Sequence, residues 1–436
     1  MNVALAKTET GRAAETIFSA ASDQLPGTGR VAETRRLAFE AYERAGLPNR
    51  RIEEWKYTDL RVLLREVKPL AAGPDASAIK HAKAALKSVA IKGGATRLVL
   101  VDGAFVPELS DAVPVGLNVR SLQEALEAGE DHLLETTSVK DTMVSLNAAL
   151  ATDGVLVGIS DGAALSKPLQ IVHVATASSA SCFTRSQLKI GKGARATLVE
   201  NFIAAEGAKA YQAHDAVLLS IGDGAELTQL RLMADGTDAA NITSAIITVG
   251  AKVKFNLFNM TAGGAVSRYQ GFVTLAGEGS DLNVNGVNLL KGTQHGDTTL
   301  LVDHAVPHCT SREVFRAVID DRAHSVFQGR IIVRPDAQKT DGKMMTRALL
   351  LSDEAEADNK PELEIFADDV TCGHGATAGA LDESLLFYLR ARGLSEKAAQ
   401  ALLIQAFVGE AIEGIADDDL REAVMAEAER WLEARA

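Results

Sequence analysis

One stretch of the sequence is the most informative about the fold: Lys360-Pro-Glu-Leu-Glu-Ile-Phe-Ala-Asp-Asp-Val-Thr-Cys-Gly-His-Gly-Ala-Thr377. In its first half, Leu363 and Ile365 alternate with acidic residues, which is the period of a half-buried strand. Its second half contains Cys372-Gly-His-Gly375, where two glycines free the backbone around a thiol and an imidazole. The segments before this stretch are typical of strands and turns, and those after it of helices. The Cys-x-His pair at the junction is therefore the first candidate for chemistry.

Upstream of this stretch, one short phrase recurs at a nearly constant spacing. A strand-like segment is followed each time by a glycine turn and a second strand-like segment, and the turns are led by Gly191, Gly222, Gly250 and Gly277. The separations between these glycines are 31, 28 and 27 residues. A fixed period of this length is typical of a solenoid, in which one unit buries its apolar face only by stacking on the next.

We therefore predict a mainly β protein with a β-helix core over residues 155–377. A propeller is disfavoured because its four-stranded blades need about 40 residues or more. Residues 1–154 are predicted to form a mostly helical N-terminal region, and residues 378–436 a helical C-terminal region. The glycine pairs of the repeats are interpreted as turn glycines rather than as a dinucleotide-binding motif.

The N-terminal region contains several predicted elements. Apolar spacing predicts helices over Val31–Ala45, Ala76–Ala90 and Ser121–His132, and Leu98–Gly103 is predicted to be a strand and a turn. Trp55 and Tyr57 stand among charged residues. We expect these two aromatic side chains to anchor a surface loop onto the core.

The C-terminal region predicts an αα-hairpin. Asp382 is expected to cap a first helix that ends at Gly393, and Ser395 to cap a second, with a final acidic helix over about 418–435. The hairpin carries more apolar surface than it can bury internally, contributed by Leu385, Leu386, Leu389, Leu403 and Phe407. We expect part of this surface to bind another protein; the alternative is that all of it caps the solenoid.

Composition excludes several functional classes. The chain has 436 residues and a formal net charge of −13, which disfavours nucleic acid as the main partner. No run reaches the roughly 18 apolar residues of a membrane span, and Met1–Ala21 lacks the apolar core of a signal peptide. Three widely spaced cysteines predict free thiols in a reducing cytoplasm rather than a disulfide framework.

The sequence lacks the common catalytic signatures of serine hydrolases, P-loop enzymes and zinc proteases. His304, His308 and Cys309 lie within six residues and raise the possibility of a zinc site, but no matching second pair of ligands follows them. The alternative is that these side chains face a strand surface or solvent. Cys182 has no neighbouring ligand and is expected to be buried.

Cys372 and His374 are the stronger candidates for metal chemistry. Residues i and i+2 of a strand share a face, so the thiol and the imidazole are expected to point the same way. These donors suit iron–sulfur clusters, zinc and copper alike. Two ligands do not complete a site, so further ligands would come from elsewhere in the fold or from another chain. A buried thiol beside a hydrogen-bonded histidine stays open as the alternative.

Several of these segments resemble the SufB/SufD family, the scaffold subunits of the SUF iron–sulfur cluster assembly machine. The resemblance is carried by Gly329–Asp341, Leu349–Leu351, Lys360–Thr377 and Phe387–Gly393. The segment Arg51-Ile-Glu-Glu-Trp-Lys-Tyr-Thr58 is similar to the SufD branch of that family.

The resemblance implies a right-handed parallel β-helix in a complex with SufB and the ATPase SufC. It implies that SufB pairs along the β-helix and that SufC docks on the C-terminal helices. In isolation, a homodimer is one possible state of the chain. His374 matches a histidine implicated in cluster assembly between the two scaffold subunits, and Cys372 matches a cysteine common in the SufD branch. Thr346 stands where SufB has its cluster-assembly cysteine, and Gly375 where SufB has a glutamate.

The resemblance thus predicts a non-catalytic scaffold that holds a transient iron–sulfur cluster shared with SufB and has no permanently bound cofactor. A β-helix enzyme acting on carbohydrate, similar to polysaccharide lyases, is the alternative, because fold alone does not fix function. That alternative expects secretion and a groove of acidic calcium ligands. The absence of a signal-peptide pattern and the Cys-x-His junction favour the scaffold.

Overall fold

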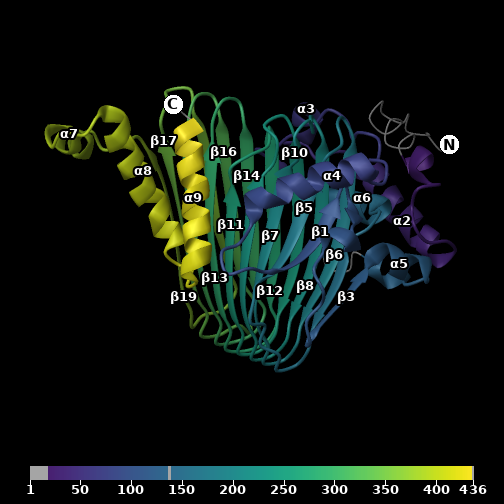
Figure 1. Ribbon diagram of the computed structural model, residues 1–436. Coiled ribbons are helices and arrows are strands. Elements are labelled where there is room, and N and C mark those ends of the chain that lie inside the picture. Colours follow the sequence, from purple (N-terminus) through teal and green to yellow (C-terminus); the bar gives the residue numbers. More distant parts are fainter. Residues whose placement is uncertain (1–17, 136–138, 435–436) are drawn as a thin grey trace, which may run out of the picture.

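The computed structural model describes residues 18–135 and 139–434 (Figure 1). Most of Met1–Ala21, for which the sequence disfavours a signal peptide, lies outside these ranges. Among the described residues, the strands form two facing sheets of ten and nine strands. Successive strands of the core alternate between the sheets, so each turn of the chain adds one strand to each sheet. The predicted β-helix is confirmed.

Strand order follows the winding of the chain. The ten-stranded sheet runs β19 (Thr371–Gly379), β17 (Asp341–Leu350), β15 (Thr310–Ile319), β13 (Asp281–Leu290), β11 (Lys254–Thr261), β9 (Glu226–Ala234), β7 (Arg195–Ala204), β5 (Leu169–Ala175), β1 (Thr96–Val101) and β2 (Ala104–Phe105). The nine-stranded sheet runs β18 (Glu356–Ile365), β16 (His324–Val333), β14 (His295–His304), β12 (Val266–Leu275), β10 (Ala240–Val249), β8 (Gln212–Ile221), β6 (Ser181–Ile190), β4 (Val155–Ile159) and β3 (Leu117–Ser121).

Parallel pairing stacks equivalent residues of successive turns into columns. In the nine-stranded sheet, Ile190 pairs with Ile221, and the column continues through Val249 and Leu275. These side chains face the interior, where the largest apolar cluster draws residues from β1 to β17. Because side chains alternate between the two faces of a strand, every second residue of each strand points into the interior.

The repeated glycines are required by the distance between stacked turns. A Cβ on Gly191 would lie 2.5 Å from the backbone nitrogen of Asp161, and one on Gly277 would lie 2.0 Å from that of Ala251. Both separations are shorter than a carbon atom permits, so a side chain there would force the turns apart. Two residues after Gly191, Gly193 has a φ of 63°, which favours glycine for a different reason. The interpretation of these residues as turn glycines is confirmed.

The N-terminal region closes one end of the solenoid. Its helices are α2 (Arg30–Ala45), α3 (Leu60–Leu63), α4 (Ala76–Ala85), α5 (Leu122–Glu127) and α6 (Thr142–Leu150), and short 3-10 turns are η1 (Glu53–Trp55), η2 (Leu86–Val89), η3 (Pro107–Leu109) and η4 (Asp131–Leu134). Each predicted helix is present, and the second ends in the 3-10 turn η2. The third is shorter than predicted: it ends at Glu127, and Ala128–Glu130 separate it from η4. The strands β2 and β3 pair antiparallel with β1 and β4, so they end the two sheets on this side.

Trp55 anchors the N-terminal region onto the nine-stranded sheet, as predicted. Its ring is 1% exposed, and its Nε1 donates a hydrogen bond to Asp141 Oδ2 at 2.9 Å. The guanidinium of Arg268 lies 3.7 Å from the ring centroid and forms a fully buried ion pair with Asp297. Tyr57 is only half-buried. This contact carries the N-terminal segment across β12 and β14 toward the other end of the solenoid.

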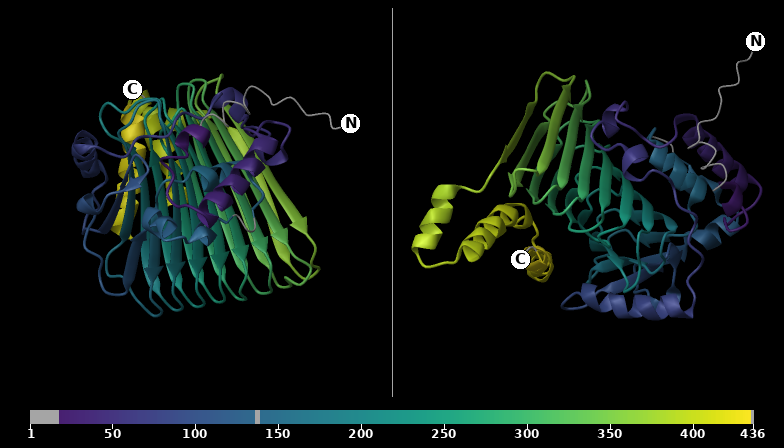
Figure 2. Two further views of the ribbon diagram at one scale, coloured as in Figure 1. Left: turned by 90° about the vertical axis from the view of Figure 1, so that its right-hand side faces the viewer. Right: turned by 90° about the horizontal axis from the view of Figure 1, so that it is seen from above.

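The C-terminal helices leave the last strand and fold back on the ten-stranded sheet. They are α7 (Glu383–Ala391), α8 (Glu396–Ile412) and α9 (Asp418–Ala434), and the predicted caps Asp382 and Ser395 accept backbone N–H bonds. Apolar residues of α8 and α9 cover the outer face of that sheet. Figure 1 and Figure 2 show α7 projecting away from the body. Within the described ranges, no helix combines the length and apolar character that crossing a membrane requires.

Candidate functional site

The solenoid ends at β18 and β19 without a cap. Within the described chain, β18 pairs with β16 alone and β19 with β17 alone, so each keeps one edge of unpaired backbone groups. Almost all of their residues are half-buried or exposed, whereas the strands behind them are mainly buried. Figure 2 shows this end uncovered, in contrast to the end closed by the N-terminal region. An open edge of this length is a template for pairing with another chain.

Cys372 and His374 both lie on β19 and face the interior of the solenoid at this open end. In the ladder, Cys372 pairs with Gly342 and His374 with Met344. Met344 is 2% exposed and belongs to the interior cluster, which fixes the direction of this face. Cys372 is half-buried against the same cluster, and His374 is exposed. The prediction that the two donors share a face is confirmed.

The thiol of Cys372 is held in its protonated form. Burial raises the pKa of the thiol, and the carboxylates of Asp341 and Glu313 raise it further, against a hydrogen bond from the Gly342 backbone that lowers it. A metal ligand has to be the thiolate, so binding would release this proton. Cys372 is therefore able to bind a metal only after its thiol loses this proton. The imidazole of His374 is exposed, so metal binding there does not have to overcome the cost of ionising a buried group.

A buried carboxyl group lies behind the two donors. Glu313 occupies the same interior column as His374, which it reaches through Met344. Its side chain is fully buried, and burial raises the pKa of the carboxyl to about 8. The carboxyl is thus predominantly neutral at pH 7. The sequence pattern gave no reason to single out this residue.

Thr346 and Gly375, the two positions that the resemblance singles out, each fit their surroundings at this end. Thr346 is 2% exposed, and its hydroxyl donates to Asn359 Oδ1 at 2.9 Å, which ties β17 to β18. Gly375 lies against Met345, whose Cε would be 2.6 Å from a Cβ at this position. A glutamate at position 375 would require that methionine to move.

The described residues contain no group of three or more histidine, cysteine, aspartate or glutamate side chains arranged to hold a metal ion. His374 and Cys372 are therefore two donors without a third of these types from the same part of the chain. Iron–sulfur clusters are commonly held by four protein ligands. Any cluster bound at this end would need donors from outside these residues.

The candidates His304, His308 and Cys309 are directed to different surroundings. His304 is fully buried, with Nε2 3.0 Å from Ser311 Oγ. Cys309 is buried and its thiol donates to the carbonyl of Gly277, at 3.4 Å. His308 is exposed on the turn. The structure matches the alternative of strand-facing and solvent-exposed side chains, and the zinc hypothesis gains no support.

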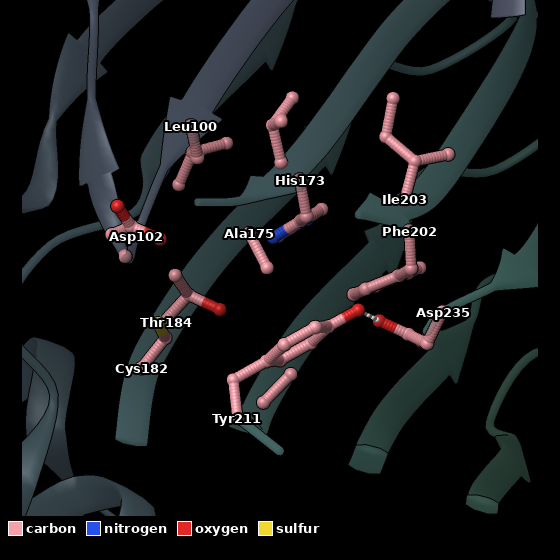
Figure 3. A pocket seen from close by; sticks show the side chains of 13 residues that line it. Leu100, Asp102, His173, Ala175, Cys182, Thr184, Phe202, Ile203, Tyr211 and Asp235 are labelled. Atoms are coloured by element: carbon pink, nitrogen blue, oxygen red, sulfur yellow. Dashed lines mark hydrogen bonds between the residues drawn. The ribbon is translucent and has the colours of Figure 1, made fainter. Parts of the chain in front are cut away.

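Cys182 is buried, as predicted, and lines a small cavity of about 30 Å³ inside the solenoid (Figure 3). Burial raises the pKa of its thiol. Beside it, the Tyr211 hydroxyl donates to Asp235 Oδ1 at 2.7 Å. The volume matches one water molecule, so the cavity is part of the internal packing and too small for a cofactor.

The helices α7 and α8 form a projecting arm, residues 383–412. Of the five apolar residues selected from the sequence, Leu385 is 50% exposed, Leu386 and Leu389 are half-buried, and Leu403 and Phe407 line a hollow of about 330 Å³ beside β19. Phe387 and Tyr388, which are 75% and 54% exposed, were not among the residues selected from the sequence. Their helical spacing alone did not reveal which face of α7 would remain uncovered.

Comparisons with known proteins agree with this architecture. A family model described as SUF system FeS cluster assembly, SufBD core domain, matches residues 173–407, and one described as SufBD protein N-terminal region matches residues 28–171. The iron–sulfur cluster assembly protein SufD of Escherichia coli (strain K12) is 30% identical over 394 residues, covering 88% of this chain and 89% of the relative.

More distant relatives are similar over most of their length. SufD of Bacillus subtilis (strain 168) is 26% identical over 324 residues, covering 70% of this chain and 72% of the relative. The chloroplastic protein ABCI7 of Arabidopsis thaliana is 25% identical over 347 residues, covering 75% and 72%. The similarity therefore extends beyond the solenoid into the terminal regions.

Proposed function

The chain belongs to the SufBD family of SUF-system iron–sulfur cluster assembly proteins, and from this premise we propose that it is a non-catalytic scaffold subunit of a SufB–SufC–SufD complex. In this complex it contributes His374 to a nascent cluster at its interface with SufB. The cluster is cargo that is built and passed on, not a resident cofactor. Family membership favours this role over the carbohydrate-active alternative.

The observation that carries the proposal is the position of His374. An exposed imidazole lies on the interior face of the last, uncapped turn, where a partner strand would continue the sheet. Cys372 is the second donor of this chain, and the described residues place no third histidine, cysteine or carboxylate ligand beside the pair. A partner that pairs with β18 and β19 would bring its own donors to the same face. This arrangement fits a cluster shared between two chains.

Cys372 is proposed to play the lesser part. Its thiol is half-buried and protonated, so it joins the cluster only when metal displaces the proton. The three cysteines among the described residues are free, which fits the reducing cytoplasm in which we place the complex.

The arm formed by α7 and α8 is proposed to dock the SufC ATPase. The residues Leu385, Phe387 and Tyr388 give its tip an apolar surface that the protein itself leaves uncovered. The base of the arm is tied to the sheet, since Glu410 on α8 pairs with Arg316 and Arg347 of β15 and β17. SufC would supply the ATP-driven conformational work, and SufB would meet the open end of the solenoid.

The test is His374→Ala compared with Cys372→Ala. The exposed His374 makes no packing contribution that its loss would damage, so folding and binding to SufB and SufC should stay at wild-type yield. Cluster assembly in cells should fall by roughly tenfold or more, a scale typical of damage to a metal site. Cys372→Ala should have the smaller effect. His132→Ala, at an exposed histidine of the N-terminal region, is the control. Wild-type cluster output from His374→Ala would refute the proposed role.

A further inference from the structure

The segment of residues 48–65, which contains η1 and α3, is fixed to the outer face of the nine-stranded sheet. The backbone N–H of Leu60 donates to the carbonyl of Pro48 at 3.0 Å, so the two ends of a loop meet there. Inside this loop, the fully buried hydroxyl of Thr58 lies 2.9 Å from His295 Nε2 on β14. The segment therefore presents its exposed side chains from a backbone of fixed shape.

The acidic side chains of this segment bind partners other than its basic side chains. Glu53 pairs with Lys360 of β18, and Glu54 lies 3.8 Å from Arg330 of β16. The third, Asp59, caps α3 by accepting a hydrogen bond from a backbone N–H group. Among the residues that the structure describes, none of these three carboxylates forms an ion pair with a basic side chain of the segment.

The basic side chains of the segment form an exposed surface. Five of them are exposed, and the ion pairs of the described residues include none of these five: Arg50, Arg51, Lys56, Arg61 and Arg65. Among them, Val62 is 66% exposed and Tyr57 is half-buried. Arginine and tyrosine side chains are enriched at protein interfaces. The chain as a whole has a net charge of −13, so this surface is opposite in sign to the rest of the molecule.

Arg65 occupies a backbone conformation that favours another residue. Its φ of 65° lies in the left-handed region, directly after the end of α3. Glycine adopts this region without the steric cost that a Cβ brings. The position thus presents a free cation on a strained backbone, a combination that is typical of sites used for recognition.

Charge and position together indicate the kind of partner. A long nucleic acid or an anionic membrane would face the whole molecule, whose net negative charge repels it. A protein can instead present a local acidic patch to residues 48–65 alone. The pair between Glu53 and Lys360 places this segment beside the last turn of the solenoid, the turn that also contains His374. If a cluster is built there as cargo, a recipient protein has to approach this turn.

We propose that residues 48–65 are the docking surface for an acidic protein that receives the cluster. The inference rests on the proposed function, and it adds a surface in the N-terminal region that is separate from the arm and from the open edges of the sheets. The acidic partner lies over the five cations, with Val62 and Tyr57 as the apolar part of the contact.

The test is a charge reversal, Arg50→Glu with Arg51→Glu, and the probe is the apo form of an acidic plant-type [2Fe–2S] ferredoxin. Fluorescence anisotropy of labelled apo-ferredoxin measures its binding to the full chain, alone and in complex with SufB. The dissociation constant should rise by about tenfold or more at low ionic strength, because attraction across the interface becomes repulsion. The difference should shrink at 1 M NaCl, where exposed charges are screened.

Two further variants separate charge at this surface from other effects. Lys83→Glu with Lys87→Glu makes the same change in net charge at exposed positions on α4 and η2, which pack on the other sheet. It should change the dissociation constant by less than about twofold, since the charges lie far from the contact. Arg65→Gly removes one cation and relieves the left-handed backbone. It should weaken binding by a smaller factor than the double reversal, without lowering thermal stability.

The inference would be overturned if the wild-type chain did not bind apo-ferredoxin, or if the double reversal bound it with wild-type affinity. It would also be overturned if a short DNA duplex bound these arginines more tightly than apo-ferredoxin, because the surface would then serve a nucleic acid. Wild-type cluster output from His374→Ala would refute the proposed function instead, and the binding constants would still decide whether residues 48–65 dock an acidic protein.

Discussion

Glu313 is a carboxyl group whose surroundings oppose its ionisation. A carboxyl group fully buried in an apolar interior is stabilised in its neutral form, and burial raises its pKa from 4.5 to about 8. The folded state therefore holds a proton that the unfolded chain releases above pH 4.5. The contribution of this residue to stability is complete below pH 4.5 and is lost as the pH rises toward 8.

Glu313→Gln is expected to remove this pH dependence, since an amide stays neutral throughout. Relative to wild type, the variant should gain roughly 3 kcal/mol in the free energy of unfolding between pH 6 and pH 8.5. Urea unfolding at both pH values measures the difference, with the exposed Glu206→Gln as the control. Parallel stability curves for wild type and Glu313→Gln over this range would show that the buried carboxyl does not titrate as described.

The sequence predicted part of the site at this scale. The spacing of Cys372 and His374 was sufficient to place them on one face of a strand, because side-chain alternation is local. It was not sufficient to say that this face is the interior, since that depends on pairing with Met344 from the preceding turn. Glu313 lies in Thr310-Ser-Arg-Glu-Val314, where polar residues give no sign of which one is buried.

The two helices of the arm differ in their contact with the body of the protein: α7 is exposed, and α8 packs on the ten-stranded sheet. The helix α7 has no buried residue, whereas α8 buries Ile404 and Val408 against the outer face of the ten-stranded sheet. Removing the whole C-terminal region would uncover that apolar face and damage the fold. Substitutions restricted to the tip of the arm are therefore the better probe of docking.

Phe387→Ser with Tyr388→Ser should weaken SufC binding by about tenfold or more, because buried aromatic side chains dominate the energy of protein interfaces. Thermal stability and SufB binding should be unchanged, since both rings are exposed in the isolated chain. Isothermal titration with SufC measures the effect, and the fully exposed Val115→Ser is the control. SufC affinity equal to wild type would mean that the tip does not dock the ATPase.

Element prediction from sequence succeeded where the cause was local. The helix caps Asp382 and Ser395 could be predicted from the sequence, because the side chain of a cap accepts hydrogen bonds from the first free N–H groups of its own helix. The repeated glycines gave the solenoid period, although the reason for Gly277 is contact with Ala251 of the preceding turn. The packing of α8 on a distant sheet leaves no local signal, and so the uncovered face of α7 was not identified.

At the scale of the whole molecule, the two ends of the solenoid are unequal. One end is closed by β2 and β3, which pair antiparallel with their neighbours, and by the N-terminal helices. The other end leaves β18 and β19 with free edges, and β19 carries the two donors. A monomeric β protein normally protects such edges. We therefore expect a partner to bind at this end of the solenoid.

Hydrogen–deuterium exchange of the full chain, alone and with SufB added, tests this expectation most directly. The backbone amides at the free edges of Glu356–Ile365 and Thr371–Gly379 should exchange rapidly in the isolated chain and become protected in the complex. The strands of the closed end should show no change on binding. Protection confined to other parts of the chain, with these two strands exchanging as before, would contradict the account.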